Sequence, residues 1–517
     1  MIGAVNTKTF DSAGRVALAL ILLLTAFRLF YAATTDITND ETHYWQWSRF
    51  PALSYFDQGP AIAWCIRLGT TLWGHTPLGV RFVGVLLAAG TSWMVFRTAQ
   101  LWLGGRAALW ALCLLAIAPL LMVGGIIATY DGPQVFCWAA ALYFLTRTVQ
   151  EDRPAFWYGV GAFVGLGLLS KLTMILFAPC VLVFLLLSPQ YRRHLFTPHP
   201  WLAFGLALVL FSPVLYWNAT HQWSMFQHAA ALNSRSRGAP PLRWFGEFLG
   251  GQAVVLSPFL FLAELAVLTG FGVKLVKQRI LVSEGERFVW SFSAPILLLC
   301  LFISLRSKME ANWPAPAHLM GIVLVALWFA GLWQSGRALA RSGIVVSVGL
   351  SVVMIVVLLF PTILPTVGLR LTAFQAQKLL ETYGWDPVMR GVQAARERLE
   401  AEGKPVYLAG VNYRVPSLMA FHLPDHPRTV ELFFATRRDQ YFFWTDPDKM
   451  IGANVVLCVD DDKKEVLPLA QRYFESVETI EPVIVRHPGF TGEVKHWRIH
   501  LCRGFKGYDP EEHVEGW

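Results

Sequence analysis

The chain has 517 residues, of which 55% are hydrophobic and only 15% are charged. Soluble domains usually carry about 25% charged residues, so this composition excludes an ordinary soluble protein and indicates that most of the chain lies in lipid. The net charge of +8 does not indicate a nucleic-acid-binding protein, because the lysines and arginines are scattered singly between apolar runs.

Apolar runs predict about eleven membrane-spanning helices, since a spanning helix needs roughly 17 to 25 mostly apolar residues. The expected spans are 14–34, 78–97, 107–126, 131–147, 155–169, 172–188, 200–217, 247–273, 288–305, 316–335 and 343–364. Because the fifth and sixth runs are short and nearly continuous, the expected fold is an all-α polytopic bundle of about eleven to thirteen helices. The first run lacks a small-residue cleavage site, so we expect it to be retained as a helix.

Basic residues indicate the orientation of these spans. In an alternating count, the following fall on one side: Lys8, Arg15, Arg97, Arg106, Arg147, Arg153, Arg192, Arg193, Lys274, Lys277, Arg279, Arg287, Arg337 and Arg341. Cytoplasmic loops are enriched in lysine and arginine, so this side and the N-terminus are predicted to be cytoplasmic. The outer side then holds 35–77, the turns near Asp131 and Lys171, the loops 218–246 and 306–315, and the tail.

The last part of the chain is predicted to be a small extracytoplasmic α/β domain. Residues 1–365 form the expected membrane domain, 366–382 a connecting segment and 383–517 the polar domain. A helix at 386–402 and strands at 405–410, 453–459 and 495–502 are expected there. Without a phosphate-binding or metal-ligand spacing, this domain is interpreted as structural or as a lid. Cys458 and Cys502 are candidates for a disulfide if the domain is extracytoplasmic.

The first outer loop carries two acids, Asp40 and Glu41, a few residues beyond the first span. Aromatic residues follow them at near-helical spacing, which predicts an amphipathic helix at the membrane surface. Helix capping by Asn39 or Asp40 and a dipole contact by Glu41 are the structural alternatives. The tryptophans and tyrosines also suit an ordinary aromatic belt.

Further ionisable residues fall at the same predicted membrane level. Asp131 and Lys171 lie at outer ends of spans, where an ionisable group is costly unless it is used. Arg235, Arg237 and Lys308 lie in outer loops, against the positive-inside trend. A helix cap, a snorkelling lysine and solvated loop cations are the alternatives for these residues taken singly. Together they predict a pocket that binds a phosphate-linked substrate.

Glycosyl transfer from a polyprenyl phosphate needs this combination of groups. A carboxylate takes the proton from the acceptor hydroxyl as it attacks the anomeric carbon, and cations stabilise the departing phosphate. One base without a second nucleophilic carboxylate predicts a single displacement with inversion.

The motifs NDETHYWQW, YFDQGPAIAW, YDGPQVFCWAA, SKLT and SKMEANWPAPAH resemble those of bacterial membrane glycosyltransferases of the GT-C superfamily, related to protein O-mannosyltransferases and to the lipid A aminoarabinose transferase. The resemblance covers roughly residues 10–365. It implies a GT-C helical bundle in the cytoplasmic membrane. The implied partners are a polyprenyl-phosphate-linked sugar, membrane lipid and a glycolipid, glycan or protein acceptor.

The resemblance also implies roles for individual residues. Asp40 is the implied base, Glu41 its neighbour and Asp131 the second acid. The implied contacts to substrate come from residues of the same motifs and of the fourth outer loop: His43, Tyr55, Asp57, Gln58, Lys171, Arg235, Arg237, Lys308 and Asn312.

The chain departs from the aminoarabinose transferases in the first loop. Where those enzymes carry an acid, a lysine and two prolines, this chain has Asp57, Gln58, Gly59 and Pro60, so a lysine contact to phosphate is missing. Some GT-C enzymes use a divalent cation at the first-loop acid, which here would be Asp40, but no histidine cluster requires one.

Two other classes of protein remain as alternatives. A transporter or flippase also carries ionisable groups in membrane segments, although nearer the midplane and often in two similar halves. A non-catalytic assembly partner would keep the fold, but retained acids argue against it. The acceptor stays open between lipid A or its core, another envelope glycan and a protein hydroxyl, with a preference for lipid or glycan.

Overall fold

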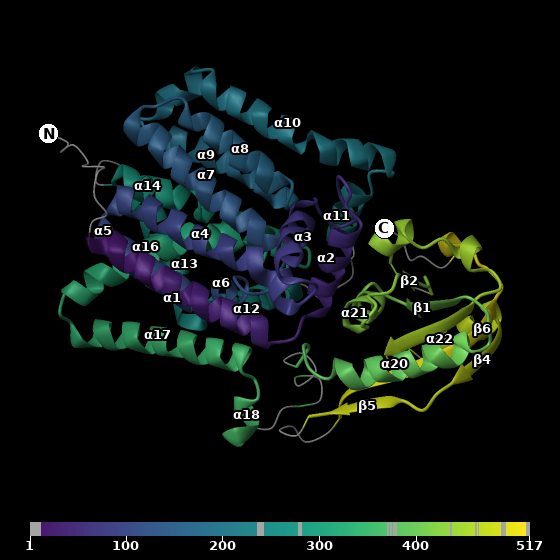
Figure 1. Ribbon diagram of the computed structural model, residues 1–517. Coiled ribbons are helices and arrows are strands. Elements are labelled where there is room, and N and C mark those ends of the chain that lie inside the picture. The colour runs from purple at the N-terminus through teal and green to yellow at the C-terminus, as the bar shows by residue number, and fades with distance from the viewer. Residues whose placement is uncertain are drawn as a thin grey trace.

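The computed structural model describes residues 12–234, 242–277, 282–369, 372, 375, 380–434, 437–460, 463, 465–487 and 493–512. A long bundle of helices is followed by a smaller domain with a mixed sheet, which packs against one end of the bundle (Figure 1). The contact between them includes helix α2 of the bundle and helix α21 of the smaller domain.

The bundle is built from apolar helices, most of them connected by short turns. Its elements are α1 (Ser12–Thr34), α2 (Asn39–Arg49), α3 (Ala61–Trp73), α4 (Pro77–Leu103), α5 (Gly105–Ile117), α6 (Pro119–Val123), α7 (Asp131–Glu151), α8 (Phe156–Leu168), η1 (Leu172–Leu176), α9 (Phe177–Leu187), η2 (Arg192–Phe196), α10 (His199–Thr220), α11 (Ser224–Ser234), α12 (Arg243–Leu256), α13 (Pro258–Lys277), α14 (Glu284–Ser291), α15 (Ala294–Ser304), α16 (Ala315–Gln334), α17 (Ala338–Leu359) and α18 (Ile363–Thr366). Among the described residues, seven helical segments are long and apolar enough to cross a membrane, and three shorter apolar segments accompany them.

Several of the expected continuous spans are interrupted. The predicted span 247–273 is wrong as a single helix, because it breaks between α12 and α13 at Ser257, whose φ is +76°, and Pro258. Proline has no N–H to continue the helical hydrogen bonds. The predicted span 107–126 breaks in the same way at Ala118 and Pro119, between α5 and α6. Apolar composition alone did not reveal these breaks.

The first outer loop folds into two helices that lie beside the smaller domain (Figure 1). Thr38 and Glu41 form a capping box that starts α2, which confirms the expected helix after the first span. Close packing then fixes the loop to the rest of the bundle. The amide of Ala61 donates to the carbonyl of Leu169 at 3.1 Å, and a Cβ at Gly59 would lie 2.1 Å from that carbonyl oxygen. Only glycine fits at position 59.

The smaller domain is a six-stranded mixed sheet with helices on both faces. Its elements are α20 (Trp385–Glu400), β1 (Val406–Gly410), α21 (Arg414–His422), β2 (Thr429–Glu431), η4 (Gln440–Phe443), η5 (Pro447–Met450), β3 (Asn454–Asp460), α22 (Val466–Tyr473), β4 (Phe474–Thr479), β5 (Val483–Arg486), β6 (Glu493–Phe505) and η6 (Pro510–Glu512). The strand order is β2-β1-β3-β6-β4, with β5 also paired to β6, and β1 runs parallel to both β2 and β3. The expected helix at 386–402 and the three expected strands correspond to α20, β1, β3 and β6.

The suggested disulfide does not form. Cys458 and Cys502 are both buried free thiols on neighbouring strands. Cys458 is opposite Ile499, whereas Cys502 is opposite Val455, so the two cysteines are three pairs apart in register. Side chains alternate between the faces of a sheet. Accordingly, Cys458 packs with α20 on one face and Cys502 packs with α22 on the other.

Candidate active site

Asp40 of α2 faces the sheet domain. The hydroxyl of Tyr413 donates to its Oδ1 at 3.0 Å, and Arg414 Nε lies 3.5 Å from the same hydroxyl. Burial, and next the negative charge of Asp40, raise the pKa of Tyr413, so the phenol stays protonated as a donor. The sheet domain therefore orients the first of the predicted acids.

Asp131, Lys171 and Asn312 meet, although they come from three distant parts of the chain. Lys171 Nζ lies 2.6 Å from Asp131 Oδ1, and Asn312 Nδ2 donates to Asp131 Oδ2 at 2.8 Å. The Lys171 side chain is only 4% exposed, so its charge is balanced by Asp131 rather than by water. Snorkelling, the structural alternative for this lysine, does not describe its position.

Tyr130 connects the two acidic centres. Burial, followed by the negative charges of Asp131, Asp57 and Asp40, raises the pKa of its phenol. Its ring also packs edge-on against Tyr44 of α2, with 5.5 Å between the ring centroids. The charges of Asp131, Asp57 and Asp40 thus all act on the Tyr130 phenol.

Asp57 belongs to a third polar group that joins the loop after α2 to the sheet domain. Its Oδ1 lies 3.1 Å from His228 Nε2 and 3.8 Å from Arg437 Nη1. Burial alone would lower the pKa of Arg437, but Asp57 and other nearby groups raise it above its ordinary value. Arg437 is therefore a fixed cation within the site.

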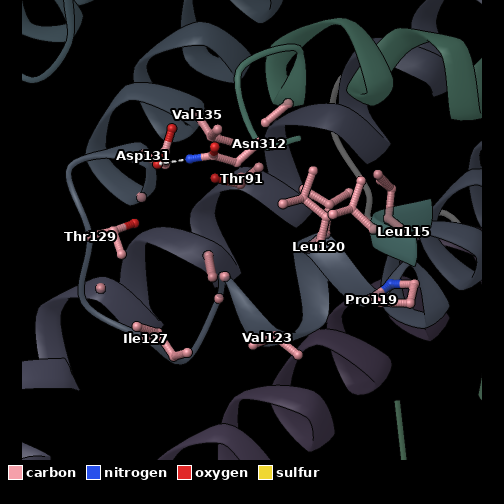
Figure 2. A pocket seen from close by; sticks show the side chains of 18 of the residues that line it. Thr91, Leu115, Pro119, Leu120, Val123, Ile127, Thr129, Asp131, Val135 and Asn312 are labelled. Carbon is pink, nitrogen blue, oxygen red and sulfur yellow. Dashed lines mark hydrogen bonds between the residues drawn. The ribbon is translucent and has the colours of Figure 1, made fainter. Parts of the chain in front are cut away.

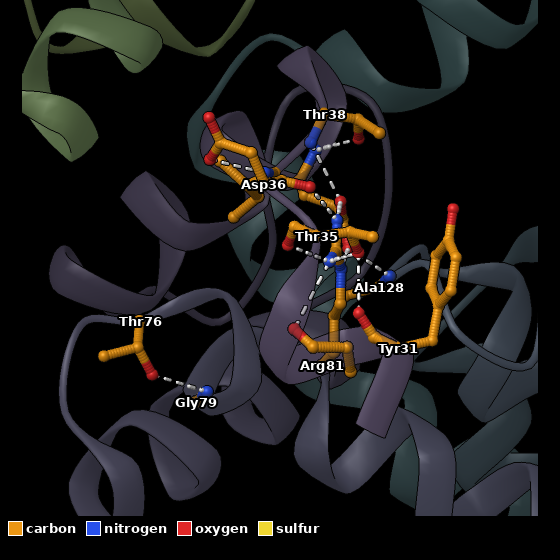
Figure 3. A network of polar contacts seen from close by, with 11 residues as sticks. Tyr31, Thr35, Asp36, Thr38, Thr76, Gly79, Arg81 and Ala128 are labelled. Carbon is orange, nitrogen blue, oxygen red and sulfur yellow. Dashed lines mark hydrogen bonds and ion pairs between the residues drawn. The ribbon is translucent and has the colours of Figure 1, made fainter. Parts of the chain in front are cut away.

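Glu41 occupies a different position from Asp40. Its carboxylate is fully buried and receives both Nε and Nη2 of Arg81 at 2.7 Å, the amide of Ala128 at 2.9 Å and the amide of Thr38 at 2.9 Å. Figure 3 shows Arg81 reaching between Thr35 and Ala128. Burial would raise the pKa of Glu41, but Arg81 and these hydrogen bonds lower it. With four donors in place, Glu41 ties α2 to α4 and to the chain before α7.

The other predicted contacts of the first loop are mainly internal. His43 accepts a hydrogen bond from Trp47 Nε1 at 3.1 Å, and burial lowers its pKa to about 3, so it is neutral. The Tyr55 hydroxyl donates to the carbonyl of Trp47 at 2.8 Å, and its ring stacks on the Trp47 ring. The Gln58 carbonyl accepts from the Tyr55 amide at 3.0 Å. These residues hold the loop that presents Asp40 and Asp57.

The remaining predicted cations are Arg235, Arg237 and Lys308. Arg235 and Arg237 lie outside the described residues. The Lys308 side chain is 52% exposed, and its ammonium lies 2.8 Å from Glu310 Oε1. The structure does not bring Lys308 into the group formed by Asp131, Lys171 and Asn312.

An apolar cavity of about 350 Å³ opens beside Asp131 and Asn312. Its walls come from α1, α4 to α7, α12, α16 and α17. Figure 2 shows the Asp131–Asn312 hydrogen bond on one side of the cavity, with Leu115, Pro119 and Leu120 opposite. Arg28 of α1 also lines it, and its Nη2 donates to the carbonyl of Leu121 at 3.1 Å. The cavity is thus an apolar space with a carboxylate, an amide and a guanidinium in its wall.

Sequence reasoning missed the residues that the sheet domain contributes. Tyr413, Arg414 and Arg437 lie in a region without a recognisable motif, and only their aromatic and cationic character distinguishes them. Tyr130 and Arg28 were also missed. An arginine inside a predicted span is, however, a signal in its own right, because such residues are costly in lipid.

The geometry does not favour a divalent cation at Asp40. Hard cations prefer several carboxylate or carbonyl oxygens around one point. Here Asp40 is paired with Tyr413, Asp131 with Lys171 and Asp57 with His228. Among the described residues, no group of three histidine, cysteine or acidic side chains has the geometry to hold a metal.

The bundle of apolar helices defines the class of protein, a polytopic membrane protein. The sequence matches the family profile of dolichyl-phosphate-mannose-protein mannosyltransferases over residues 57–217. A lipid A galacturonosyltransferase of Rhizobium johnstonii is 28% identical over 330 residues, which are 63% of this chain and 68% of that protein. An undecaprenyl phosphate-α-4-amino-4-deoxy-L-arabinose arabinosyl transferase of Pectobacterium carotovorum is 27% identical over 63% of this chain and 61% of its own length.

The fold is shared with a solved membrane enzyme. ArnT from Cupriavidus metallidurans bound to undecaprenyl phosphate superposes with a TM-score of 0.62 at 15% identity, covering 96% of this chain and 99% of that chain. Its apo structure gives a TM-score of 0.60. With the sequence matches, this similarity shows that the chain shares the fold of ArnT and is similar in sequence to membrane glycosyltransferases.

Proposed function

We propose that the chain is an inverting glycosyltransferase that moves a sugar from a polyprenyl-phosphate carrier to a lipid or glycan hydroxyl at the outer face of the cytoplasmic membrane. The observation that carries this proposal is the apolar cavity that opens beside Asp131 and Asn312. A pocket with mostly apolar walls and a few polar groups suits a ligand with a long hydrocarbon tail and one polar end.

The relatives support the two substrates. One acts on lipid A, by its name, and another is named for an undecaprenyl-phosphate-linked sugar. The solved structure with the same fold contains undecaprenyl phosphate. These names support a polyprenyl-phosphate sugar as donor and a lipid A-like acceptor in our proposal, with another envelope glycan or a protein hydroxyl as the alternative acceptor.

In this proposal Asp40 is the general base. Tyr413 holds one of its oxygens at 3.0 Å, which orients the carboxylate toward an entering hydroxyl. The hydroxyl oxygen attacks the anomeric carbon, its proton passes to Asp40, and the bond from that carbon to the phosphate oxygen breaks. A single displacement inverts the configuration at this carbon.

Cations around the cavity assist the departing phosphate. Lys171 stands beside Asp131, and Arg28 lines the same cavity from α1. Fixed positive charges in a site that excludes water stabilise the developing negative charge more than mobile solvent does. Asp131 keeps Lys171 in place, and Glu41 has a supporting role because Arg81 occupies its carboxylate.

The C-terminal domain is proposed to lie on the outer side and to complete the site, since it supplies Tyr413 and Arg437. This proposal goes beyond the structural or lid role expected for the domain from the sequence. Orientation can be checked by labelling single cysteines in the domain from outside intact cells.

The test uses purified full-length protein in lipid nanodiscs with undecaprenyl-phosphate-linked sugars and lipid A as acceptor. Asp40→Asn is expected to reduce kcat by at least about 100-fold, the usual contribution of a general base, while donor binding persists. Asp425→Asn is the matched control, because Asp425 is 50% exposed and pairs with Arg396 at the surface. Full transfer by Asp40→Asn would reject Asp40 as the base. Mass spectrometry of envelope lipids from a deletion strain would identify the acceptor.

A further inference from the structure

A buried chain of hydrogen bonds joins three membrane helices to the segment that contacts Asp131. His318 of α16 lies 2.8 Å from Glu264 of α13 through Nδ1 and 2.8 Å from Gln252 Oε1 of α12 through Nε2. Gln252 Nε2 donates to the carbonyl of Ala311 at 2.9 Å. Asn312, the next residue, donates to Asp131.

The direction of each hydrogen bond can be deduced from its acceptor. The Ala311 carbonyl can only accept, so the amide nitrogen of Gln252 faces it and the amide oxygen faces His318. His318 therefore carries a proton on Nε2. One further proton must lie between His318 Nδ1 and the Glu264 carboxyl, because two bare acceptors would repel each other at 2.8 Å. The pair is neutral as a whole.

Burying the polar side chains of this hydrogen-bond chain costs free energy. Glu264, His318 and Gln252 all have an exposed fraction of 0%. Polar groups buried among membrane helices are costly unless their hydrogen bonds are satisfied. The backbone makes room for the acid, since a Cβ at Gly321 would lie 1.7 Å from Glu264 Oε1. His318 also ends the sequence motif that contains Asn312, and the proposed chemistry gives it no other role.

We propose that Glu264, His318 and Gln252 form a positioning chain, which fixes the Ala311 carbonyl and thereby holds the Asn312 amide against Asp131. This inference rests on the proposed function, because it assigns importance to the orientation of Asp131. An amide side chain separates His318 from Ala311, and amides do not readily pass protons. The chain therefore orients the site and does not conduct a proton to it.

A double-mutant cycle tests whether Gln252 acts through Asn312. Asn312→Ala and Gln252→Leu are each expected to lower kcat/KM for the donor by roughly 10- to 100-fold, as for one lost hydrogen bond to a charged group. The double variant is expected to match Asn312→Ala alone, because the same contact is already lost. The KM for the acceptor should not change. Additive losses would overturn the proposal.

Gln252→Met gives a second cycle in case Gln252→Leu fails to fold. Methionine is unbranched and close to glutamine in length, but it has no N–H to donate to Ala311. Its expected result with Asn312→Ala is the same absence of additivity. Thermal unfolding of each variant shows whether it is folded before its kinetics are compared.

Variants of Glu264 separate positioning from a role that needs a charge or a mobile proton. Glu264→Gln can donate to His318 Nδ1, so it is expected to retain donor kcat/KM within about 3-fold of the wild type. Glu264→Leu cannot, and it should behave like Gln252→Leu. Ser351→Ala is the control for loss of a buried interhelical contact, since Ser351 Oγ lies 2.7 Å from Ser257 Oγ. A Glu264→Gln variant as slow as Glu264→Leu would overturn the proposal.

The result that would reject the proposed function differs from the result that would reject the positioning chain. If the folded wild type transfers no sugar from any polyprenyl-phosphate donor, the proposed function fails. If the wild type transfers sugar and the Gln252 and Glu264 variants all match it, the proposed function stands and the positioning chain is rejected.

Discussion

The hydroxyl of Tyr413 lies 3.0 Å from Oδ1 of Asp40, so a residue of the sheet domain contacts the proposed base in the bundle. Other contacts fix the same two surfaces. The Phe56 amide donates to Gln440 Oε1 at 2.8 Å, and Arg49 Nη2 donates to the His426 carbonyl at 2.7 Å. Asp40 is therefore oriented by a part of the chain more than 370 residues away in sequence.

Tyr413→Phe is expected to lower kcat by roughly 10-fold, because a hydrogen bond to a charged group is lost and the carboxylate is free to turn. The ring remains, so the melting temperature should change little. Tyr407→Phe is the control, since the Tyr407 hydroxyl donates to the Lys449 carbonyl at the surface. Steady-state rates of sugar transfer measure the effect. Equal kcat values for both variants would remove Tyr413 from the site.

Glu41→Gln is expected to destabilise the protein by about 3 to 5 kcal/mol, because Arg81 would stay buried without a carboxylate. Arg81 and Glu41 are 2% and 0% exposed. The pKa of Glu41 is lowered in the folded protein. Its stabilising effect is therefore complete above the ordinary value of 4.5 and is lost as the pH falls below it. Unfolding in detergent at several pH values measures this.

The control for Glu41 is Glu310→Gln, which breaks an exposed pair with Lys308. Exposed pairs contribute about 0 to 1 kcal/mol, so its unfolding should resemble that of the wild type. A Glu41→Gln variant that is stable but inactive would point to catalysis by Glu41 instead of support.

The helical bundle and much of the site could be predicted from local patterns. Length and apolarity indicate spans, and the ionisable residues that they leave at one membrane level include Asp40, Asp131 and Lys171, whereas Asn312 was indicated only by the motif resemblance. The interruption at Ser257 escaped prediction because both flanking segments are equally apolar. An apolar run indicates a segment that contacts lipid, but it does not show where the helix within that segment breaks.

The distinction between Asp40 and Glu41 could not be made from sequence. Neighbouring residues on a helix point about 100° apart, so one faces the site and the other faces Arg81. Which residue is which depends on tertiary contacts. The same reason explains why Tyr413 was missed, since its role exists only through docking of the two domains.

Asp439→Asn is expected to change how stability depends on pH. Burial raises the pKa of Asp439 to about 6, above its ordinary value of 3.8. As the pH rises from 4 to 6, the unfolded chain therefore loses this proton first, and wild-type stability falls. Asparagine can still accept the Tyr441 amide at 2.8 Å and does not ionise.

The free energy of unfolding of Asp439→Asn, relative to wild type, should consequently rise by about 1 to 3 kcal/mol between pH 4 and pH 7.5. Chemical unfolding of both proteins across this range measures it, with Asp425→Asn as the exposed control. A difference that stays constant with pH would show that Asp439 ionises normally in the folded protein.

Gly84→Leu tests whether the cavity holds the polyprenyl tail. Gly84 lines the cavity from α4, and a Cβ there would meet nothing within 4 Å, so leucine can enter without disturbing the wall. The KM for an undecaprenyl-linked donor is expected to rise roughly 10-fold, because the side chain takes space that the tail needs. A donor with a short prenyl chain should be affected less. Gly349→Leu on α17 is the matched control, since a Cβ at Gly349 also meets nothing within 4 Å. An equal rise in KM for long and short donors, or no rise for either, would place the tail elsewhere.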